Sequence, residues 1–566
     1  MKRHSRDSFF VVGEGVLEFG ENGEATTRRP STTEELRRFR FSRLGPKGTG
    51  TSEELRVALA TAMAPGPAVA QPDSEDPAVP AGFTYLGQFV DHDLTMDRTE
   101  AQLGSEVNLD ELLQGRSPAL DLDSVYGRGP RDRDDRVFYA EDGVKLKVGT
   151  TTPVPFPDEG TNVPFEGFDL PRRGGDAGTA ADRRLPLIPD ARNDENLVVA
   201  QTHLAFIRFH NRVVDELALT GLTGERLFRA AKELVVRHYQ YMLKTDFLPR
   251  IVDPAIVDDV FTNGRRFFEV PGRCHGRDNT PTMPIEFSVA SYRLGHSMIR
   301  GAYQWNRVFN STGPGGIATL FALFTFTGVA GNFDPSSQTP ADLDDVNRGP
   351  IFTLPSNWIA DFRRLYDFAE AGRDDLVPPA EIGGGNVAKE IDTLLVNPLT
   401  ALPAGTFGGR GTQFRDVERN LAFRNLTRAG MMDLASGQQM AGLMGVEPLT
   451  AEQLLTGGPG GVSLDALTDE QKAELVEATP LWFYVLREAE LNSGRLGPVG
   501  GRITAEVFHR AIEGSRISIV RSPYWRPTLG PDSSTFRMVD LLLFAFEGKA
   551  DLLNPLGDPV AGPAGA

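Results

Sequence analysis

Apolar residues recur at helical spacing along most of this chain. Between residues 197 and 219 they return at intervals of three, four or seven, which places them on one face of a helix. Residues 224–247 repeat this pattern, and Pro249 is expected to end that helix because proline lacks the backbone N–H that a helix requires. The pattern therefore predicts two long helices that follow one another in the sequence.

Shorter segments with the same spacing predict further helices. The first, residues 51–64, has Thr51 or Ser52 as its N-terminal cap and Glu53 and Glu54 in its first turn. The others cover residues 284–305, 356–365, 414–427, 464–477, 480–491, 503–512 and 538–546. Patterns typical of strands are few, and the sequence contains no internal repeat. The sequence therefore indicates a mainly α protein with long connecting loops.

The segments outside these helices differ from them in composition. Residues 1–50 are polar and rich in Arg and Gly, and we expect an N-terminal arm that lies on the body of the protein. Residues 64–82 and 140–190 are rich in Pro, Gly or acidic residues and predict irregular loops, the second with room for one hairpin. We expect one domain over residues 51–550 and a flexible tail over residues 551–566.

Composition and charge limit the classes of function. The chain has 566 residues, of which 40% are hydrophobic, and a formal net charge of −18. Such an acidic balance argues against nucleic acid as a partner, since phosphate binding needs clustered Lys and Arg. The single cysteine, Cys274, excludes a disulfide within the chain and a zinc site built from several cysteines.

No stretch of the sequence predicts a membrane span. The longest apolar segment, residues 317–331, is shorter than the ~20 residues that a spanning helix needs. The first residues, MKRHSRDSFFVVGEG, are basic, but the long apolar run of a secretory signal does not follow them. We expect a soluble protein that is either cytoplasmic or exported by a route without such a signal.

The segment LGQFVDHDLT, residues 86–95, places polar side chains between apolar ones. If it is helical, Asp91, His92 and Asp93 point about 100° apart, and Gln88 shares the face of His92. One interpretation is a histidine that faces a pocket, with a carboxylate on each side that serves another direction. The alternative is a buried, satisfied histidine beside two solvated acids.

Two later segments offer partners for this histidine. Arg192 and Glu195 are one helical turn apart immediately before the helix predicted at residue 197, although an exposed ion pair often has the same spacing. His296 follows Gly295, which lets a bulky group approach the backbone closely. Asn425, if it lies near His296, could accept a hydrogen bond from its Nδ1 and fix the tautomer of the ring.

Together these segments resemble the animal-type haem peroxidases of the peroxidase–cyclooxygenase superfamily, in their bacterial branch. GQFVDHDLT is similar to the family's distal-histidine motif, and YRLGHSMI to its proximal-histidine motif. The RxxE of residues 192–195, which runs into HxxxxRxHNRVVDEL, is similar to the segment of the catalytic arginine, and SPALDLDSVYG to the calcium loop. The resemblance covers residues 75–550, in the order and approximate spacing of the family.

The resemblance implies roles for five side chains around a haem iron. His296 would be the axial ligand of the iron, and Asn425 would hydrogen-bond to it from behind. His92 would take a proton from peroxide and return it, and Arg192 would stabilise the charge that develops as the O–O bond breaks. Gln88 would help to position water or halide above the iron.

Further residues are implied to hold the haem b group itself. Arg428, and less directly Arg293, would pair with haem propionates. Asp91 and Glu195 occupy the positions whose carboxylates form ester bonds to haem methyl groups. Asn196 stands where the mammalian myeloid enzymes have a methionine bonded to haem, so a third covalent link is not expected.

A calcium ion is also implied beside the distal helix. Asp93 would contribute a carboxylate from that helix, and the loop SPALDLD would wrap the ion and supply other oxygen ligands. The loop ligands would be Ser117, Ala119 through its carbonyl oxygen, Asp121 and Asp123. The alternative interpretation of this loop is an acidic surface turn.

The implied fold is mainly α, with long helices around a central haem, extensive irregular loops and little β structure. The implied function is a peroxidase that reduces hydrogen peroxide and oxidises small organic donors or halides through high-valent iron. A fatty-acid dioxygenase of the same superfamily is an alternative, but the position of its radical tyrosine, three residues before the proximal histidine, is Arg293 here. Tyr292 is one residue out of register.

Two other classes of function are alternatives. One is a haem-bearing adhesion or matrix protein without turnover. The other is a metal-dependent hydrolase that uses the Asp and His residues of the distal segment, which would need more clustered ligands than the sequence offers. His203 and His210 lie on one side of the long helix without a third ligand, and we interpret them as structural.

Overall fold

The structure is a computed structural model of the chain. It describes residues 9–10, 16–19, 25–28, 39–64, 79–97, 99, 101, 103–175, 178, 180–271, 281–329, 352–402, 415–458 and 460–558. Residues 65–78 of the predicted loop over residues 64–82 and most of the predicted N-terminal arm lie outside these ranges, as does Cys274.

The two long helices that the apolar spacing predicts are confirmed. They are α6 (Leu197–Ala218) and α7 (Gly224–Met242). Asn196 is the N-cap of α6, and its side chain accepts a hydrogen bond from Val199 N at 2.9 Å. The prediction that Pro249 ends the second helix is wrong: a π helix (Leu243–Phe247) follows α7, and Pro249 lies in the first turn of a short further helix, where proline is tolerated because that N–H needs no helical partner. The other helices are α2 (Glu53–Met63), α3 (Gly82–Leu94), α4 (Asp123–Tyr126), α5 (Ala180–Arg184), α8 (Leu248–Ile251), α9 (Pro254–Asn263), α10 (Gly295–Met298), α11 (Leu421–Met431), α12 (Gly437–Met444), α13 (Ala451–Thr456), α14 (Asp469–Glu477), α15 (Leu481–Glu490), α16 (Gly500–Gly514), α17 (Met538–Ala545) and α18 (Ala550–Leu553).

Strands contribute little, as predicted for a mainly α chain. The strands are β1 (Phe9–Phe10), β2 (Val16–Phe19), β3 (Ala25–Arg28), β4 (Phe41–Ser42), β5 (Gly149–Thr150), β6 (Glu166–Asp169), β7 (Met283–Pro284), β8 (Ala302–Tyr303) and β9 (Ala318–Thr319). β1, β2 and β3 form one antiparallel sheet, and β5 with β6 is the hairpin for which the loop over residues 140–190 has room. β4 and β7 pair in parallel, and β8 and β9 pair antiparallel.

Three of the predicted helices are wrong in detail. In place of the helix predicted over residues 414–427, a 3-10 helix (Asp416–Arg419) precedes α11, because Asn420 between them has φ −76° and ψ 120°. Over residues 284–305 the chain forms a π turn, a 3-10 helix and then α10, because Ala290 leaves the helical conformation with φ −126° and ψ −79°. Over residues 356–365 it forms two 3-10 helices. The side chain of Asp361 accepts a hydrogen bond from Arg363 N at 3.1 Å, so it competes with the backbone acceptors that a continuous helix would use.

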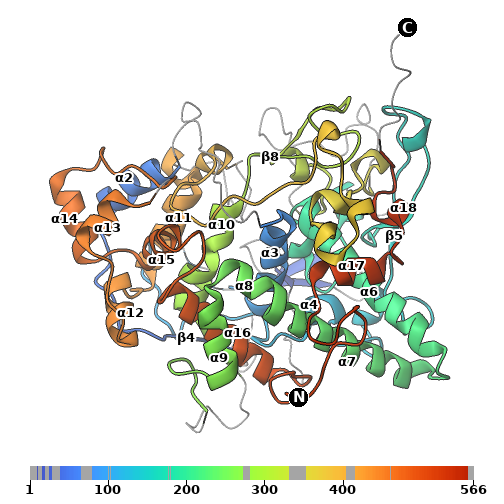
Figure 1. Cartoon of the computed structure of the whole chain (residues 1–566), viewed down its shortest axis with the longest axis horizontal. Coiled ribbons are helices and arrows are strands. Elements are labelled where there is room, and N and C mark those ends of the chain that lie inside the picture. The colour runs from blue at the N-terminus through green and yellow to red at the C-terminus, as the bar shows by residue number, and fades with distance from the viewer. Residues whose placement is uncertain are drawn as a thin grey trace.

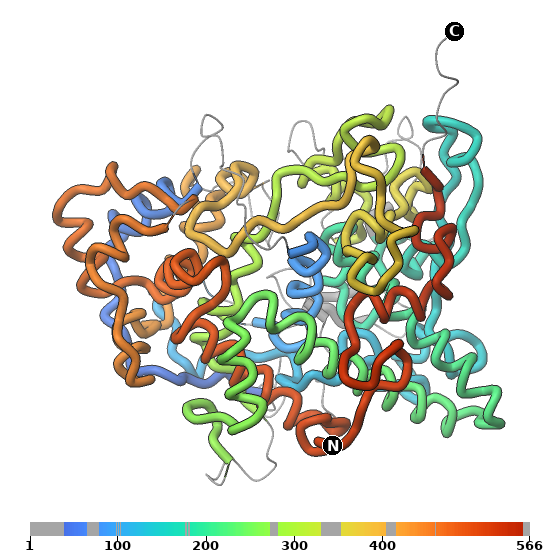
Figure 2. Tube along the Cα trace, viewed as in Figure 1, coloured from blue at the N-terminus to red at the C-terminus, as the bar shows by residue number. Residues whose placement is uncertain are grey.

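Helix α3 lies near the middle of the molecule (Figure 1). It packs against α6 and α10, and α6 in turn packs against α7 and α17. Figure 2 shows that the N-terminal helix α2, in blue, reaches the far end of the molecule, beside the late helices α11 and α14. Segments that are distant in sequence are therefore interleaved throughout, and α3 has structural elements around it on several sides.

The start of α3 and its central aromatic residue fix the position of this helix. A Cβ atom on Gly82 would lie 2.3 Å from Cζ of Tyr366, so only glycine allows the helix to begin so close to that ring. About two turns further on, Phe89 stacks on Phe206 of α6 with 4.6 Å between ring centroids. Complete burial of a phenylalanine contributes about 1.5–3 kcal/mol, so this contact ties α3 firmly to α6.

Both predicted ends of the domain contact its body where they are described. Arg43, in the predicted N-terminal arm, donates a hydrogen bond to the carbonyl of Asp433 at 2.6 Å. The boundary predicted at residue 551 falls inside α18, and Asp558 accepts a hydrogen bond from Arg363 at 3.2 Å. Residues 551–558 of the predicted tail therefore contact the body of the protein, and residues 559–566 lie outside the described residues.

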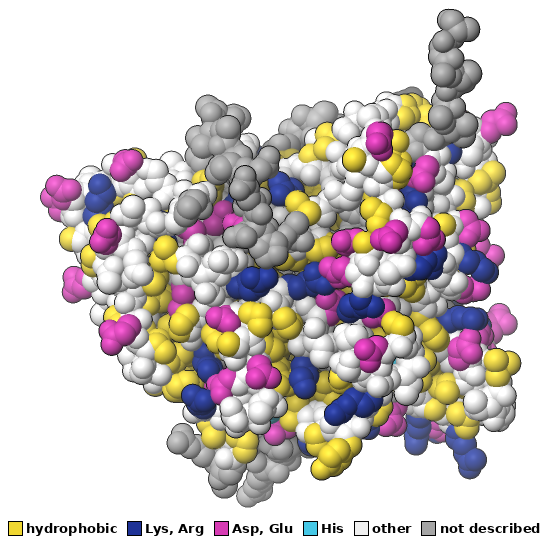
Figure 3. Space-filling view, viewed as in Figure 1, with side chains coloured by type: hydrophobic (Ala, Val, Ile, Leu, Met, Phe, Trp, Pro, Cys, Tyr) yellow, Lys and Arg dark blue, Asp and Glu magenta, His cyan; other side chains and the backbone are white. Residues whose placement is uncertain are grey.

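The surface charge and the lengths of the helices concern two classes of partner, nucleic acids and lipid bilayers. On the face shown in Figure 3, the described Lys and Arg side chains are interspersed with Asp and Glu and with apolar side chains. Among the described residues, none of the helices combines the length and the apolar character that crossing a bilayer requires.

Three buried histidines outside the candidate site each act to destabilise this fold in acid. Burial lowers the pKa of His210, His238 and His509, which lie outside the candidate site, to about 4. In the unfolded chain the pKa is about 6.5, so the stabilising effect of the neutral rings is complete above about pH 6.5 and decreases as the pH falls toward about 4.

Each of these rings contributes about 1.4 kcal/mol per pH unit between pH 6 and pH 5, because the unfolded chain takes up a proton there and the folded chain does not. Chemical unfolding of the natural protein and of a His238→Gln variant at these two pH values separates one ring from all other titrating groups. Between pH 6 and pH 5 the unfolding free energy of the variant should fall by about 1.4 kcal/mol less than that of the natural protein. An equal pH dependence of the two proteins would contradict the prediction.

Candidate functional site

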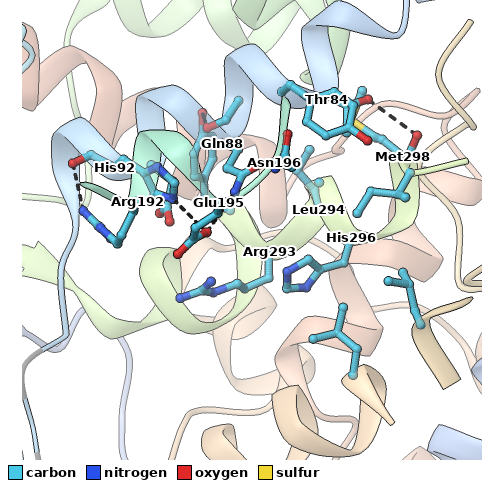
Figure 4. Close-up of a pocket in the computed structure, with 18 of the residues that line it drawn as sticks. Thr84, Gln88, His92, Arg192, Glu195, Asn196, Arg293, Leu294, His296 and Met298 are labelled. Atoms are coloured by element: carbon cyan, nitrogen blue, oxygen red, sulfur yellow. Dashed lines mark hydrogen bonds and ion pairs between the residues drawn. The ribbon is translucent and has the colours of Figure 1, made fainter. Parts of the chain in front are cut away.

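The two histidines that stand about two hundred positions apart in the sequence face one cavity. The cavity has a volume of about 230 Å³, and both His92 from α3 and His296 from α10 line it. In Figure 4, Arg192 and Glu195 lie on the side of His92, while Arg293 lies nearer to His296. The packing of α10 against α3 brings these segments together.

His92 is held from behind by an amide. Its Nδ1 lies 2.8 Å from Oδ1 of Asn193, and its Nε2 lies on the cavity side, 3.8 Å from Oε2 of Glu195. Burial, together with the nearby Arg192 guanidinium, lowers the pKa of His92 to about 4. The ring is therefore a neutral base at neutral pH.

Arg192 is fixed by a buried carboxylate. Asp190 accepts hydrogen bonds from Nε and Nη2 of Arg192 at 3.1 and 2.8 Å, and Arg192 Nη2 also donates to the carbonyl of His92 at 3.0 Å. Arg116 donates to the same carboxylate through its Nε at 2.8 Å. Burial acts to raise the pKa of Asp190, but the two guanidinium groups outweigh it and hold that pKa well below its usual range.

Gln88 lies between two polar residues of the next segment. Its Nε2 donates to Oε2 of Glu195 at 3.2 Å, and its Oε1 accepts from Nδ2 of Asn196 at 2.9 Å. Burial raises the pKa of Glu195 to about 7, although Arg192 acts against this. Asn196 therefore both caps α6 and orients Gln88 toward the cavity.

His296 has an amide partner on its far side. Nδ1 of His296 lies 2.9 Å from the side-chain nitrogen of Asn425, in α11. Rotation of this amide by 180° exchanges its oxygen and nitrogen at the same spacing, so that Nδ1–H can donate to Oδ1. Burial, together with Arg293, lowers the pKa of His296 to about 3, which keeps the ring neutral.

The remaining cofactor-binding residues predicted from the sequence lie in and around this cavity. Asp91 lines it and accepts a hydrogen bond from Oγ1 of Thr95 at 2.8 Å. Arg293 also lines it and donates through its Nε to the carbonyl of Ser288 at 2.8 Å. Arg428 does not line the cavity directly but forms an ion pair with Asp97, which does.

Apolar side chains form much of the rest of the wall. They come from α3, from the π helix after α7, from the end of α10, from the segment after β9, and from positions 399, 402 and 421. These residues are Phe83, Phe247, Met298, Ile299, Leu320, Phe321, Phe324, Leu399, Leu402 and Leu421. A few polar groups on an apolar wall are typical of a small-molecule or cofactor site.

Asp93 points away from the cavity, toward the predicted calcium loop. Its carboxylate accepts hydrogen bonds from Leu122 N at 3.1 Å and from Ser124 N at 3.2 Å. Burial and the neighbouring Asp121 carboxylate raise its pKa to about 7 and raise the pKa of Asp123 well above its usual value. Three buried carboxyl groups therefore lie close together here.

The loop itself is buried and strained. Ser117, Ala119, Asp121 and Asp123 are all buried, so the alternative of an exposed acidic turn is wrong. Leu122, between the two aspartates, has φ 57° and ψ 36°, a left-handed conformation that is costly for a branched side chain. In the part of the chain that the structure describes, no three Asp, Glu, His or Cys side chains converge in the manner of a metal site.

Three residues of the site were not predicted from the sequence to belong to it. Asp190 carries a weak signal, because aspartate is a preferred N-cap residue and Asp190 directly precedes the 3-10 helix Ala191–Asp194. Asn193 carries none, and His203, which the sequence analysis interpreted as structural, accepts a hydrogen bond from Nδ2 of Asn193 at 2.9 Å through its Nδ1. Only the folded structure places these side chains next to His92.

Part of the chain matches a known protein family. Residues 95–322 match the animal haem peroxidase family, a range that includes Arg192 and His296 and starts just after His92. A peroxidase-like protein of Margaritifera margaritifera is 29% identical over 273 residues, which are 42% of this chain and 33% of that protein. Myeloperoxidase of Mus musculus is 25% identical over 182 residues, 30% of this chain and 24% of that protein. The chain thus spans a third or less of these relatives.

Solved structures show the same fold over nearly the whole chain. Peroxidase A from Dictyostelium discoideum has a TM-score of 0.54 at 14% identity and covers 91% of this chain and 94% of its own. Oryza sativa fatty acid alpha-dioxygenase has a TM-score of 0.51 at 11% identity and covers 90% and 81%. The family match, these relatives and the shared mainly helical fold lead to one conclusion: residues 95–322 match an animal haem peroxidase domain, and the described chain has the fold of these structures.

Proposed function

We propose that this protein is a haem-dependent peroxidase that reduces hydrogen peroxide and oxidises small organic donors or halides. The observation that supports it is the arrangement of two pairs, His92 with Arg192 and His296 with Asn425, around one cavity. One pair has a neutral base and a cation for peroxide, and the other has an imidazole with a partner on its far side.

The residues around the cavity fit a haem group. In the described structure Nε2 of His296 has no hydrogen-bond partner, so its lone pair is available to a metal when Nδ1 carries the hydrogen. A Cβ atom added to Gly295, beside it, would meet no atom within 4 Å, which leaves open space next to the ligand. The apolar wall suits a porphyrin, and Arg293 offers a cation to a propionate.

We infer that two carboxylates form the ester links that the family resemblance implies. Asp91 and Glu195 both line the cavity, from α3 and from the segment before α6. The raised pKa of Glu195, about 7, reflects a partly apolar setting in which a neutral ester costs less than a carboxylate. Mass spectrometry of the haem released by protease digestion would detect either link.

Each polar side chain on the side of His92 has a defined task in this proposal. Bound haem supplies the iron that accepts the two oxidising equivalents of the peroxide. His92 takes a proton from one peroxide oxygen at Nε2 and returns it to the other, which leaves as water. Arg192, held by Asp190, stabilises the negative charge on the departing oxygen. Gln88 orients water or a halide beside them.

Removal of the Asp190 charge tests the fixed position of Arg192. An Asp190→Asn variant leaves Arg116 and Arg192 buried without an anion, so it should destabilise the fold by about 3–5 kcal/mol. The reaction with peroxide should slow about 10–100-fold, the usual effect of losing an outer partner of a reacting group. Stopped-flow mixing with peroxide and chemical unfolding measure the two effects.

Asp361→Asn is the matched control. Asp361 likewise caps a 3-10 helix and binds the arginine two residues later, Arg363, with Nε at 2.9 Å, but it lies outside the cavity. This control should lose stability and keep its rate with peroxide. Equal loss of rate in both variants would show that Asp190 acts only through folding.

A calcium ion between α3 and the loop over residues 117–123 completes the proposal. The donor set fits, since Asp93, Asp121 and Asp123 are hard oxygen ligands, and one described lysine, Lys232, at 3.8 Å from Asp123, partly offsets their charge. The carboxylates would turn toward a common point on binding, joined by Ser117 and the carbonyl of Ala119. Because Asp93 follows His92 directly, the ion would also hold α3 in place.

Removal of calcium should lower stability. Elemental analysis is expected to find one calcium ion per chain, and calcium at about a thousand times its dissociation constant should raise the unfolding free energy by about 4 kcal/mol over the chelated protein. An Asp121→Asn variant should lose most of this difference. Identical melting temperatures with calcium and with chelator would contradict the calcium proposal.

Product analysis separates the proposed function from its alternatives. The protein should consume peroxide in proportion to an oxidised phenolic donor, which a haem-bearing matrix protein without turnover would not do. A dioxygenase would instead convert a fatty acid with uptake of oxygen. Tyr292 lines the cavity, and its hydroxyl donates to the carbonyl of Gly87 at 3.3 Å.

A further inference from the structure

Three buried side chains behind His92 form a continuous row of hydrogen bonds. Nδ1 of His92 lies 2.8 Å from Oδ1 of Asn193, and Nδ2 of Asn193 lies 2.9 Å from Nδ1 of His203. Both Asn193 and His203 are completely buried, and His92 is only 5% exposed. Water therefore does not take the place of any member of the row.

The amide of Asn193 can serve this row in two ways. With its oxygen toward His92, that ring carries its hydrogen on Nδ1 and leaves the lone pair of Nε2 for the cavity. With the amide reversed, His203 would donate from its own Nδ1, and His92 would carry its hydrogen on Nε2. The tautomers of the two histidines are therefore coupled through one amide.

The first arrangement suits a group that receives and returns a proton. When His92 takes up a proton at Nε2, both of its ring nitrogens become donors, and only an amide oxygen can accept from Nδ1. The structure has the oxygen of Asn193 on this side already. A proton can then enter and leave at Nε2 without any movement of the amide.

His203 keeps the amide in this orientation. Its Nδ1 accepts from Asn193, which places its own hydrogen on Nε2, and that Nε2 is buried without a hydrogen-bond partner in the described structure. An unpaired buried polar atom costs free energy, so His203 is a poor choice for packing alone. The contribution of His203 is the hydrogen bond that its Nδ1 accepts from Asn193.

We propose that Asn193 and His203 are positioning residues that hold His92 with its hydrogen on Nδ1 and the lone pair of Nε2 toward the cavity. The catalytic use of that lone pair rests on the proposed peroxidase function, but the tautomer itself does not. The charged groups that face His92 are Asp91 on its own helix and Asp190, Arg192 and Glu195 on the adjoining segment.

The tautomer of His92 is the first measurement. The protein is purified with ¹⁵N-labelled histidine rings, any haem iron is reduced and bound to carbon monoxide so that it is diamagnetic, and the signal of His92 is assigned with a His92→Ala variant. We expect hydrogen on Nδ1 in the natural protein. A His92 ring with its hydrogen on Nε2 would overturn the proposal, whatever the protein does.

Variants of the row are the second measurement. His203→Leu removes an acceptor and an unpaired polar atom together, so it should fold, and it should slow the reaction with peroxide about 10–100-fold and show both tautomers of His92. His203→Gln, whose side-chain oxygen can accept from Asn193, should restore the rate and the single tautomer. Asn193→Leu should behave as His203→Leu does.

His210→Leu is the matched control. His210 is an equally buried histidine on the same helix, bonded to the carbonyl of Val144 at 2.9 Å and to the hydroxyl of Tyr126 at 3.0 Å, and it does not line the cavity. Its loss should leave the rate with peroxide and the tautomer of His92 unchanged. A loss of rate equal to that of His203→Leu would overturn the proposal.

The outcomes separate this inference from the proposed function. If His92→Ala reacts with peroxide at the natural rate, the function of His92 is wrong, and the labelled ring still decides the tautomer. If His92→Ala is slow while His203→Leu and Asn193→Leu keep both the natural rate and the natural tautomer, the function stands and the positioning role is overturned.

Discussion

A His296→Ala variant is expected to purify with little or no haem. His296 is the imidazole that lines the cavity with a free Nε2, and Asn425 holds its other nitrogen at 2.9 Å. Among the described residues of the cavity wall, the other histidine is His92, whose Nδ1 is engaged by Asn193. Alanine removes the proposed ligand to iron, so that before any ester link forms only the apolar walls and the propionate contact of Arg293 would hold the porphyrin. The ratio of Soret absorbance to protein absorbance measures the loss.

His509→Ala serves as the control for this variant. His509 is also buried, and its Nδ1 lies 2.6 Å from Nη1 of Arg265, outside the cavity. It should lose stability but keep its haem, provided that it is studied at a temperature at which it is folded. A His296→Ala protein with a normal Soret band and normal turnover would show that another residue binds the iron.

The second large effect is expected from the side of the cavity where His92 lies. His92→Ala and Arg192→Ala should each slow the reaction with peroxide at least ~100-fold while haem is retained, because one removes the proton acceptor and the other the fixed positive charge. The rate of the first spectral change after rapid mixing with peroxide measures this step separately from oxidation of the donor.

The matched control for the arginine is Arg363→Ala. Arg363 is a buried arginine paired with Asp361, much as Arg192 is paired with Asp190, and it lies outside the cavity. Its variant should show the cost in stability without the loss of rate. If His92→Ala and Arg192→Ala both react with peroxide at the natural rate, these residues have no part in the step.

Local pattern was sufficient to predict the elements that carry the site. The apolar period over residues 197–219 and 224–247 predicts α6 and α7 because their buried faces repeat at helical spacing over many turns. In α3, the different orientations of the Asp91, His92 and Asp93 side chains follow from helix geometry alone. Asp93 does point away from the cavity that His92 lines.

The partners of these residues could not be predicted from the pattern. Asn193 and His203 act through contacts between α3 and the start of α6, and a spacing rule within one helix says nothing about a neighbour in space. Asp97 pairs with Arg428, more than three hundred positions later, so the position of this cation near the cavity depends on tertiary packing.

The prediction was poor in segments where the apolar spacing favours a helix but other local contacts interrupt it. Over residues 284–305 the apolar spacing favours one helix, but the chain turns at Ala290, and this turn orients His296 toward the cavity on a helix of one turn. Around Asp361, a capping side chain outweighs the apolar period and divides the segment. In both places contacts that the period does not encode decide the backbone.

The central claim is that His92 and His296 face one bound haem from opposite sides of the cavity. Its most direct test is the absorption spectrum of the purified protein before and after hydrogen peroxide is added. We expect a Soret band that shifts within milliseconds to seconds of mixing and returns when a reducing donor is supplied. A colourless protein that neither takes up haem nor changes with peroxide would contradict the claim.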